Sequence, residues 1–254
     1  MIDWAELTLF MYITARMSGF VLFNPILGRR NIPGIFRSGF MLVLSVFVIS
    51  FAAPNSVRVP GSLIEMASRL LTEFVLGYLL GLVMNFFFYI PQLAGQTIDT
   101  QMGMTMNQVY DFSSQANLSV SSMLLNTLMT LLFFAAGGHH TLLRLMLTSQ
   151  EVVAFGTVTL GTEAANAMLE VFIECTLLAV KLCMPILAAE LLGQLGMGVL
   201  MKVIPQINVF SINIELKVII GLTLLLLLMA PFSEFLLEAE RAMLDSMHTL
   251  LGLL

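Results

Sequence analysis

The sequence contains apolar runs that are long enough to cross a lipid bilayer. The run from Ser38 to Val57, between Arg37 and Arg58, carries no charged residue. A helix of about 20 apolar residues crosses the roughly 30 Å hydrocarbon layer of a membrane. Five further apolar runs cover 7–27, 71–93, 124–136, 164–204 and 218–235. Together these runs predict about six helical membrane spans and therefore an all-α integral membrane protein.

The balance of charges supports a membrane protein and argues against a nucleic-acid partner. Only 11% of the 254 residues are charged and 58% are hydrophobic, whereas soluble domains contain about 25% charged residues. The net charge is −5 and the chain has three lysines, while nucleic-acid binding requires clustered Lys and Arg. Cys175 and Cys183 lie in an apolar run, so we expect buried free thiols.

Several residues predict how the first helices begin, pack and end. Asp3 and Glu6 precede the first apolar run, whereas a secretory signal begins with positive charge, so we expect this run to be retained. Gly77 and Gly81 have the GxxxG spacing that is typical of closely packed membrane helices. Pro91 predicts that the third helix ends or kinks there.

One polar segment, from Gly95 to Met123, separates two of the apolar runs. Its only charged residues are Asp99 and Asp111. Four methionines occur in it: Met102, Met104, Met106 and Met123. Structureless loops longer than about 12–15 residues are usually functional or disordered, and unbranched methionine adapts to irregular surfaces. We therefore interpret this segment as the functional centre. Its composition suits a loop that closes a channel around varied cargo, and the alternative is that methionine is simply abundant, since the chain contains 19.

Three ionisable residues recur along one face of the run 164–204. Glu170, Glu174 and Lys181 are four and seven positions apart, so a helix places them on the same side. Ionisable groups at membrane depth normally face a bundle interior or a water-filled cavity. The alternative is that the helix extends beyond the bilayer and exposes a hydrated polar stripe. The residues alone leave both interpretations open.

The sequence lacks the common motifs for catalysis and cofactor binding. None of its lysines follows a glycine, as a phosphate-binding loop requires, and GxSxG and HExxH are absent. His139 and His140 are adjacent, without the four-residue spacing of a helical zinc pair. We expect no enzymatic activity, no metal and no cofactor. An ion-coupled transporter of small solutes that uses Asp99 and Glu174 is the alternative, although the two halves of the chain do not look alike.

Two motifs resemble those of a known family. The stretch GQTIDTQMG resembles the G-x-x-I-D-x-Q-M-G signature of the FliR family of flagellar biosynthetic proteins, which includes the equivalent proteins of virulence type III secretion systems. The matching residues are Gly95, Ile98, Asp99, Gln101, Met102 and Gly103. The stretch MGVLMKVIPQINVF, 197–210, is similar to the second family signature, in which a basic residue shortly precedes Pro-Gln.

The resemblance implies a fold, a location and partners. The fold would consist of helical hairpins, with a FliP-like part over 1–163 fused to a FliQ-like hairpin and tail over 164–254. The chain would be a non-enzymatic subunit of the flagellar export gate, in the bacterial inner membrane at the flagellar basal body. FliP-like and FliQ-like subunits and an FlhB-like protein would be its partners, and unfolded exported proteins its cargo. A gate subunit of a virulence system is the alternative.

The resemblance also implies roles for three groups of residues. Met104 to Ser122 corresponds to the loop that plugs the channel, with sealing residues at Met104, Met106, Val109, Tyr110 and Phe112. Some relatives have aromatic residues at positions 106 and 109 and a proline at 112, so here Tyr110 and Phe112 are expected to supply the bulk. A cytoplasmic tip would contact the FlhB-like partner through Lys202, Pro205, Gln206, Asn208 and Phe210. The stripe of Glu170, Glu174 and Lys181 would be an inter-subunit contact.

Overall fold

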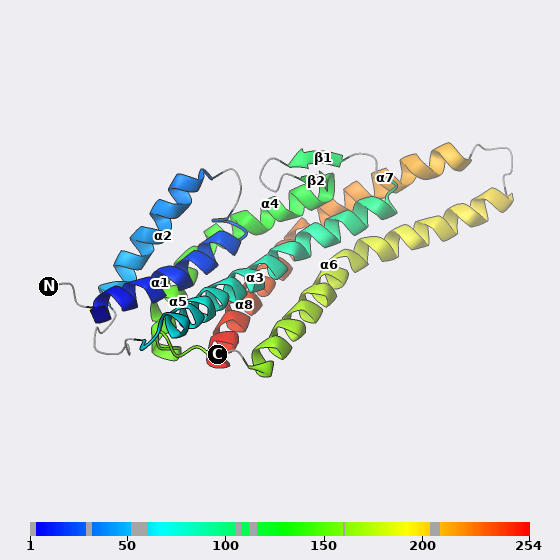
Figure 1. Ribbon diagram of the computed structural model, residues 1–254. Helices are drawn as coiled ribbons and strands as arrows, with labels where there is room; N and C mark the ends of the chain where they lie inside the picture. Colours follow the sequence, from blue (N-terminus) through cyan, green and yellow to red (C-terminus); the bar gives the residue numbers. More distant parts are fainter. Residues whose placement is uncertain are drawn as a thin grey trace. The chain divides into compact units, whose positions relative to one another are not determined.

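The computed structural model describes residues 4–28, 32–51, 60–104, 108–111, 116–159, 161–203 and 209–254. The helices are α1 (Trp4–Phe23), α2 (Gly34–Ile49), α3 (Leu63–Gln101), α4 (Val120–Ala135), α5 (Gly138–Val152), α6 (Thr162–Val203), α7 (Val209–Leu227) and α8 (Met229–Gly252). Between α3 and α4, the strands β1 (Gln108–Asp111) and β2 (Ala116–Ser119) pair antiparallel (Figure 1). The prediction of a helical membrane fold is therefore confirmed, with a short β-hairpin as an addition.

The described residues contain fewer spans than the six expected. Three helices, α1, α3 and α6, are long and apolar enough to cross a membrane alone. The pair α4 and α5, bent by 65°, and the pair Glu215–Leu227 and α8, bent by 61°, meet the same criterion as pairs. The number of candidate spans is thus three to five. With 16 residues, α2 is roughly 24 Å long and too short to cross alone, and the run 218–235 is divided between α7 and α8.

Neither internal proline ends its helix. Pro91 lies inside α3, which continues to Gln101, and Pro185 lies inside α6, which continues to Val203. The polar stretch from Gly95 to Gln101 is therefore helical, and not part of the loop that the sequence predicts. Its threonine hydroxyls donate to main-chain carbonyls one turn earlier, so these polar side chains are satisfied within the helix.

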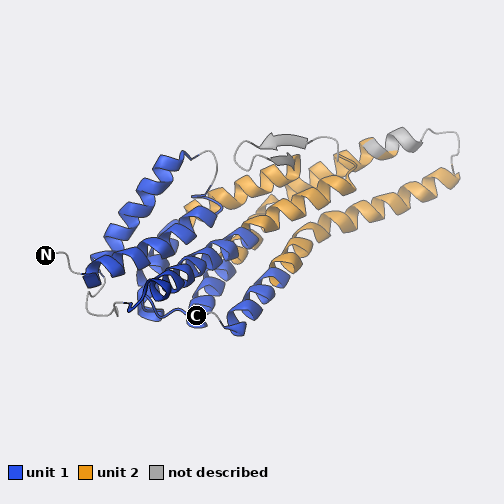
Figure 2. Ribbon diagram, viewed as in Figure 1, with its two compact units in different colours: residues 1–87, 137–173, 241–254 blue, residues 88–136, 174–240 orange. Residues whose placement is uncertain are grey.

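The described chain forms two compact units (Figure 2). Unit 1 contains residues 1–87, 137–173 and 241–254, and unit 2 contains 88–136 and 174–240. Helices α3, α6 and α8 contribute residues to both units. This division reflects compactness and says nothing about resemblance to FliP or FliQ, so the boundary at 163/164 stays a prediction.

In unit 1, helices α1 and α3 pack with their main chains in close contact. A Cβ atom on Gly77 would lie 2.0 Å from the carbonyl oxygen of Arg16, and one on Gly81 would lie 3.1 Å from the carbonyl of Phe23. Gly19, on α1, is equally close to the main chain of α3. The prediction that the GxxxG pair marks a close helix crossing is confirmed.

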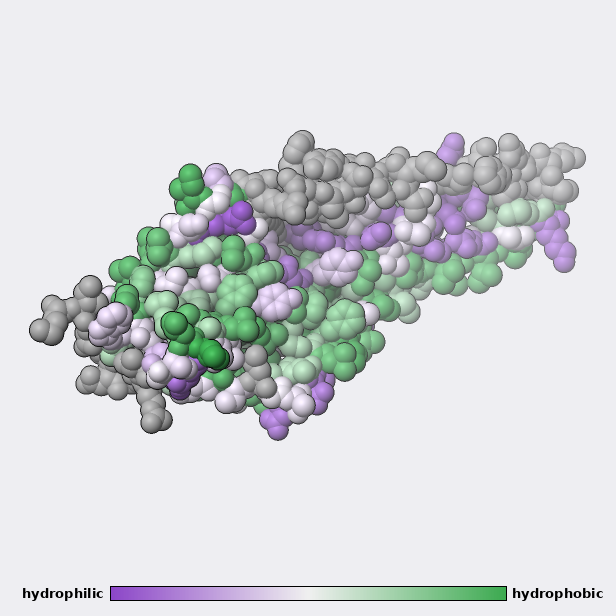
Figure 3. All heavy atoms as spheres, in the orientation of Figure 1, coloured by the Kyte–Doolittle hydropathy of each residue, from purple (hydrophilic) through white to green (hydrophobic). Residues whose placement is uncertain are grey.

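Several helices, α2 and α6 among them, leave large apolar side chains exposed, and Figure 3 shows hydrophobic surface over both α2 and α6. On α6 the exposed apolar residues include Phe172, Ile173, Leu177, Leu192, Leu195 and Val199. Contiguous apolar surface of this kind marks contact with membrane or with protein. The surface of α6 therefore requires lipid or a neighbouring subunit to cover it.

Candidate functional site

In unit 2, α3 ends in a left-handed glycine immediately before the hairpin. Gly103 has φ +80°, a conformation that glycine adopts without the steric penalty of a side chain. The N–H of Met104 donates to the main-chain carbonyl of Asp99 at 2.8 Å. The end of α3 thereby fixes the point where the chain enters the segment 105–118.

The side chain of Asp99 reaches the start of α4. Asp99 is 1% exposed, and its carboxylate accepts hydrogen bonds from the main-chain N–H of Ser121 at 2.9 Å and from the Ser121 hydroxyl. Ser119 is the N-cap of α4 and accepts from the N–H of Ser122. Unpaired N–H groups and the helix dipole make this end of a helix a favourable place for a carboxylate. One residue, Asp99, thus binds the chain on both sides of the hairpin, at Met104 and at Ser121.

Gly95 allows this approach because it has no side chain. A Cβ atom there would lie 2.3 Å from the main-chain nitrogen of Ser122, closer than real contacts allow. The hydroxyl of Ser122 donates to the Gln92 carbonyl at 2.7 Å and lies 2.7 Å from the Ser119 hydroxyl. The first turn of α4 therefore lies directly on α3.

The remaining signature residues lie around the same position. Ile98 and Met102 are fully buried, and a Cβ atom on Gly221 of α7 would lie 2.5 Å from the Met102 methyl carbon. Gln101 is half-buried in the last turn of α3. Met102 therefore packs α3 against α7 just before the hairpin begins. We name the set formed by Gly95, Asp99, Ser119, Ser121 and Ser122 the hairpin root.

The hairpin itself is a two-stranded ladder. Val109 pairs with Leu118, and Tyr110 pairs with Asn117. Of the five predicted sealing residues, Met104 is half-buried, and Val109 and Tyr110 lie in β1. The side chains of Val109 and Tyr110, and the whole of Met106 and Phe112, are outside the part of the chain that the structure describes.

The other predicted sites lie on α6 and just beyond it. Glu170, Glu174 and Lys181 are all exposed along this helix, and within the described ranges their side chains form no hydrogen bond or ion pair. Lys202 is exposed in the last turn of α6. Pro205, Gln206 and Asn208 are outside the described residues, as is the side chain of Phe210 in α7.

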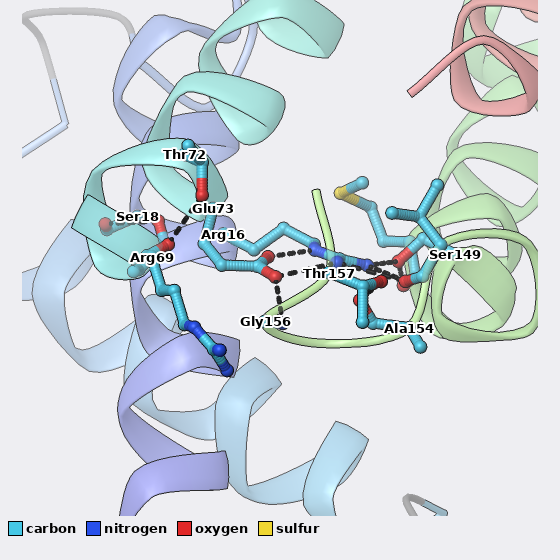
Figure 4. A network of polar contacts seen from close by, with 12 residues as sticks. Arg16, Ser18, Arg69, Thr72, Glu73, Ser149, Ala154, Gly156 and Thr157 are labelled. Atoms are coloured by element: carbon cyan, nitrogen blue, oxygen red, sulfur yellow. Dashed lines mark hydrogen bonds and ion pairs between the residues drawn. The ribbon is translucent and has the colours of Figure 1, made fainter. Parts of the chain in front are cut away.

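Unit 1 contains a buried ion pair that the sequence reasoning did not select (Figure 4). Arg16 of α1 and Glu73 of α3 are both fully buried, with Nε of Arg16 2.7 Å from Oε2 of Glu73 and Nη2 3.2 Å from Oε1. Arg16 also donates to the Ser149 hydroxyl and to the Val153 carbonyl, each at 3.1 Å. Glu73 accepts the N–H of Gly156 at 2.7 Å.

This cluster joins α1, α3 and the connection that follows α5. The guanidinium carbon of Arg16 also lies 4.3 Å from the centre of the Phe155 ring, a cation–π distance. Because both charges are hydrogen-bonded and dehydrated, the cluster is suited to hold helices and not to bind a ligand. A signal for it existed, since Arg16 interrupts an apolar run and an ionisable residue at membrane depth normally has a partner.

The hairpin root and the Arg16–Glu73 cluster both hold parts of the chain in position. In the described ranges no group of three or more His, Cys, Asp or Glu residues is placed to hold a metal ion. The Asp99 carboxylate, which the transporter alternative would use for ion coupling, is already occupied by Ser121. The hairpin root can therefore hold a short hairpin at a fixed place between α3 and α4.

Sequence comparisons relate the chain to proteins of one kind. Residues 7–243 match the family described as "Bacterial export proteins, family 1". The flagellar biosynthetic protein FliR of Bacillus subtilis is 26% identical over 252 residues, which cover 96% of this chain and 95% of that protein. The FliR of Escherichia coli is 26% identical over 233 residues, covering 91% and 88%. The FliR of Aquifex aeolicus is 28% identical over 212 residues, covering 84% and 81%.

Proposed function

Because the chain belongs to the bacterial export proteins of family 1, the FliR family, we propose that its β-hairpin closes the channel through which unfolded flagellar proteins are exported. Family membership makes the chain a non-enzymatic component of the flagellar type III export apparatus in the inner membrane. The hairpin, over residues 105–118, would be the movable barrier. The hairpin root, together with Met102 and Gly103, would be its fixed base.

The observation that carries this proposal is that Asp99 binds both ends of the hairpin. A barrier must return to one position after each exported chain, so its attachment has to be rigid. Its body must also give way, and an isolated two-stranded hairpin is at best marginally stable in water. A rigid attachment and a weakly stable body are the two properties that a displaceable plug needs.

We also propose that α6 contacts neighbouring gate subunits of the FliP-like and FliQ-like kinds. The 42 residues of α6 make a helix of roughly 63 Å, about twice the hydrocarbon thickness, so much of it lies outside the lipid layer. Glu170, Glu174 and Lys181 are exposed beside large apolar side chains. A protein neighbour with complementary charges satisfies such a surface better than lipid does.

Two further assignments follow from the family resemblance. The tip from Lys202 to Phe210 would contact the FlhB-like partner, which a cysteine at position 206 or 208 tests by cross-linking in the assembled gate. The division into a FliP-like part over 1–163 and a FliQ-like part over 164–254 belongs to the same proposal.

Replacing residues 106–118 by a short Gly/Ser linker tests the barrier. This change keeps the Ser119 cap and the contact between Asp99 and Ser121, so the helices retain their connections. The expected result is a gate that still co-purifies with its partner subunits but conducts small ions when reconstituted in liposomes. A Gly/Ser linker in place of residues 52–59, between α2 and α3 and outside the hairpin, controls for nonspecific disruption. An assembled gate that stays impermeable without 106–118 would overturn the proposal.

A further inference from the structure

We propose that the hairpin receives its cargo by strand addition, so that an extended segment of the exported polypeptide pairs with an open edge of β1 or β2. This inference rests on the gate function proposed above and names what the hairpin recognises. The recognised feature is the main chain of an unfolded protein, and not a particular sequence of side chains.

The first step of the argument is the state of the strand edges. Among the described residues, β1 and β2 form a two-stranded sheet, so each strand uses one edge for pairing with the other and has a second edge without a partner strand. In an antiparallel pair, alternate residues direct their N–H and C=O groups toward the partner strand and away from it. Two of the four residues in each strand therefore present main-chain groups outward. In the described part of the chain, no backbone hydrogen bond joins either strand to another element.

The second step is the chemistry that such an edge selects. Outward groups recur every second residue, about 6.6 Å along a strand, and an extended polypeptide carries donors and acceptors at the same repeat. Strand addition of this kind draws its affinity from main-chain hydrogen bonds, with side-chain pockets adding specificity. The strand sequences QVYD and ANLS contain one charged residue, Asp111, so the edge imposes little charge preference. These properties suit a channel that must pass many different unfolded sequences.

The third step concerns release. With four residues in each strand, an added strand forms only a short ladder, and short edges limit lasting association. Because the side-chain period of a strand is two, a register shift of two residues restores the same ladder. Cargo that is paired in this way can advance in two-residue steps, with the hairpin root holding the hairpin in place.

Cross-linking a stalled cargo tests the inference. An exported protein fused to a domain that resists unfolding is held in the assembled gate. The gate carries Val109→Cys or Tyr110→Cys, in a background with Cys175→Ala and Cys183→Ala. Single cysteines are placed at ten consecutive positions of the cargo segment that lies in the channel. The expected result with one gate cysteine is strong disulfide formation at every second cargo position. The other gate cysteine, one residue away, should favour the cargo positions in between. Thr100→Cys, exposed on α3, is the control and should show no alternation.

The other outcomes separate strand addition from the gate function. Cross-links of equal strength at all ten positions would reject strand addition and keep the hairpin as a gate. Alternating cross-links to a neighbouring subunit in the absence of cargo would show that the strand edge pairs with that subunit. This result would also reject strand addition by cargo. If no cross-link forms, the linker variant of 106–118 decides: a leaky gate rejects strand addition alone, whereas a tight gate rejects the gate function as well.

Discussion

The carboxylate of Asp99 accepts a hydrogen bond from the main-chain N–H of Ser121 at 2.9 Å, although the two residues are 22 positions apart in sequence. The main-chain carbonyl of the same aspartate accepts the N–H of Met104. One residue therefore binds both ends of the hairpin, through its main chain at Met104 and through its carboxylate at Ser121, and a substitution of Asp99 releases the Ser121 end.

We predict that Asp99→Ala loosens the hairpin without preventing assembly of the gate. The substitution leaves the N–H and hydroxyl of Ser121 without their acceptor, and buried hydrogen bonds to a charged group contribute about 1.5–3 kcal/mol each. Limited proteolysis of the purified gate should cut the segment 105–118 faster than in the natural protein. Asp99→Asn should give an intermediate rate because its amide oxygen still accepts one bond. Thr100→Ala is the matched control, and equal cleavage of all variants would contradict the role of Asp99.

Gly95→Ala should lower the stability of the gate subunit. The added Cβ atom would lie 2.3 Å from the main-chain nitrogen of Ser122, so the start of α4 must move, and overpacking typically costs about 1–3 kcal/mol. Gly196→Ala is the control, since a Cβ there meets nothing within 4 Å and alanine favours a helix by about 1 kcal/mol. The measurement is the temperature at which the purified complex dissociates. A Gly95→Ala complex as stable as the Gly196→Ala complex would show that α3 and α4 do not pack as described.

Arg16→Met should be strongly destabilising. It leaves the Glu73 carboxylate buried without its cation, and breaking a buried pair from one side costs about 3–5 kcal/mol. Adding Glu73→Gln removes the uncompensated charge while keeping an acceptor for the Gly156 N–H, so the double variant should accumulate in membranes to a higher level than Arg16→Met alone. Glu65→Gln, which weakens a half-exposed pair with Arg69, should have a smaller effect. A double variant less abundant than Arg16→Met would show that the two charges are not coupled.

Changing the stripe on α6 should affect assembly and not folding. Glu170 and Glu174 are exposed, so replacing both by glutamine removes no described hydrogen bond or ion pair of the chain. We expect normal amounts of the chain in membranes and a several-fold lower yield of FliP-like and FliQ-like subunits that co-purify with it. Glu163→Gln, exposed in the first turn of the same helix, is the control. If the double variant and the control retain equal amounts of partner, the stripe faces water and not a subunit.

The sequence predicted the features that depend on neighbouring residues. The apolar runs became the long helices α1, α3 and α6, and the spacing of Gly77 and Gly81 predicted the close contact of α3 with α1. The motif GQTIDTQMG predicted the family, which the match over residues 7–243 confirms. In each case the informative residues lie within a few turns of one another.

The features that were missed depend on residues far apart in the chain. Arg16 meets Glu73 across 57 positions and Ser149 across 133, and no local pattern specifies such partners. The sequence predicts a longer loop than the structure has, because the polar residues from Gly95 to Gln101 suggest an end of the helix. Thr97 and Thr100 instead bond carbonyls within their own helix, so α3 extends to Gln101.

The burial of Arg16 has a consequence for how the chain is made. The ribosome adds Glu73 57 residues after Arg16, an interval of about 3–11 s at about 5–20 residues per second. During that interval the translocon handles a helix whose central arginine opposes insertion by about 2.5–3.5 kcal/mol. α1 is therefore stabilised in the membrane when α3 arrives and Glu73 pairs with Arg16. Before that, the first helix depends on the insertion machinery.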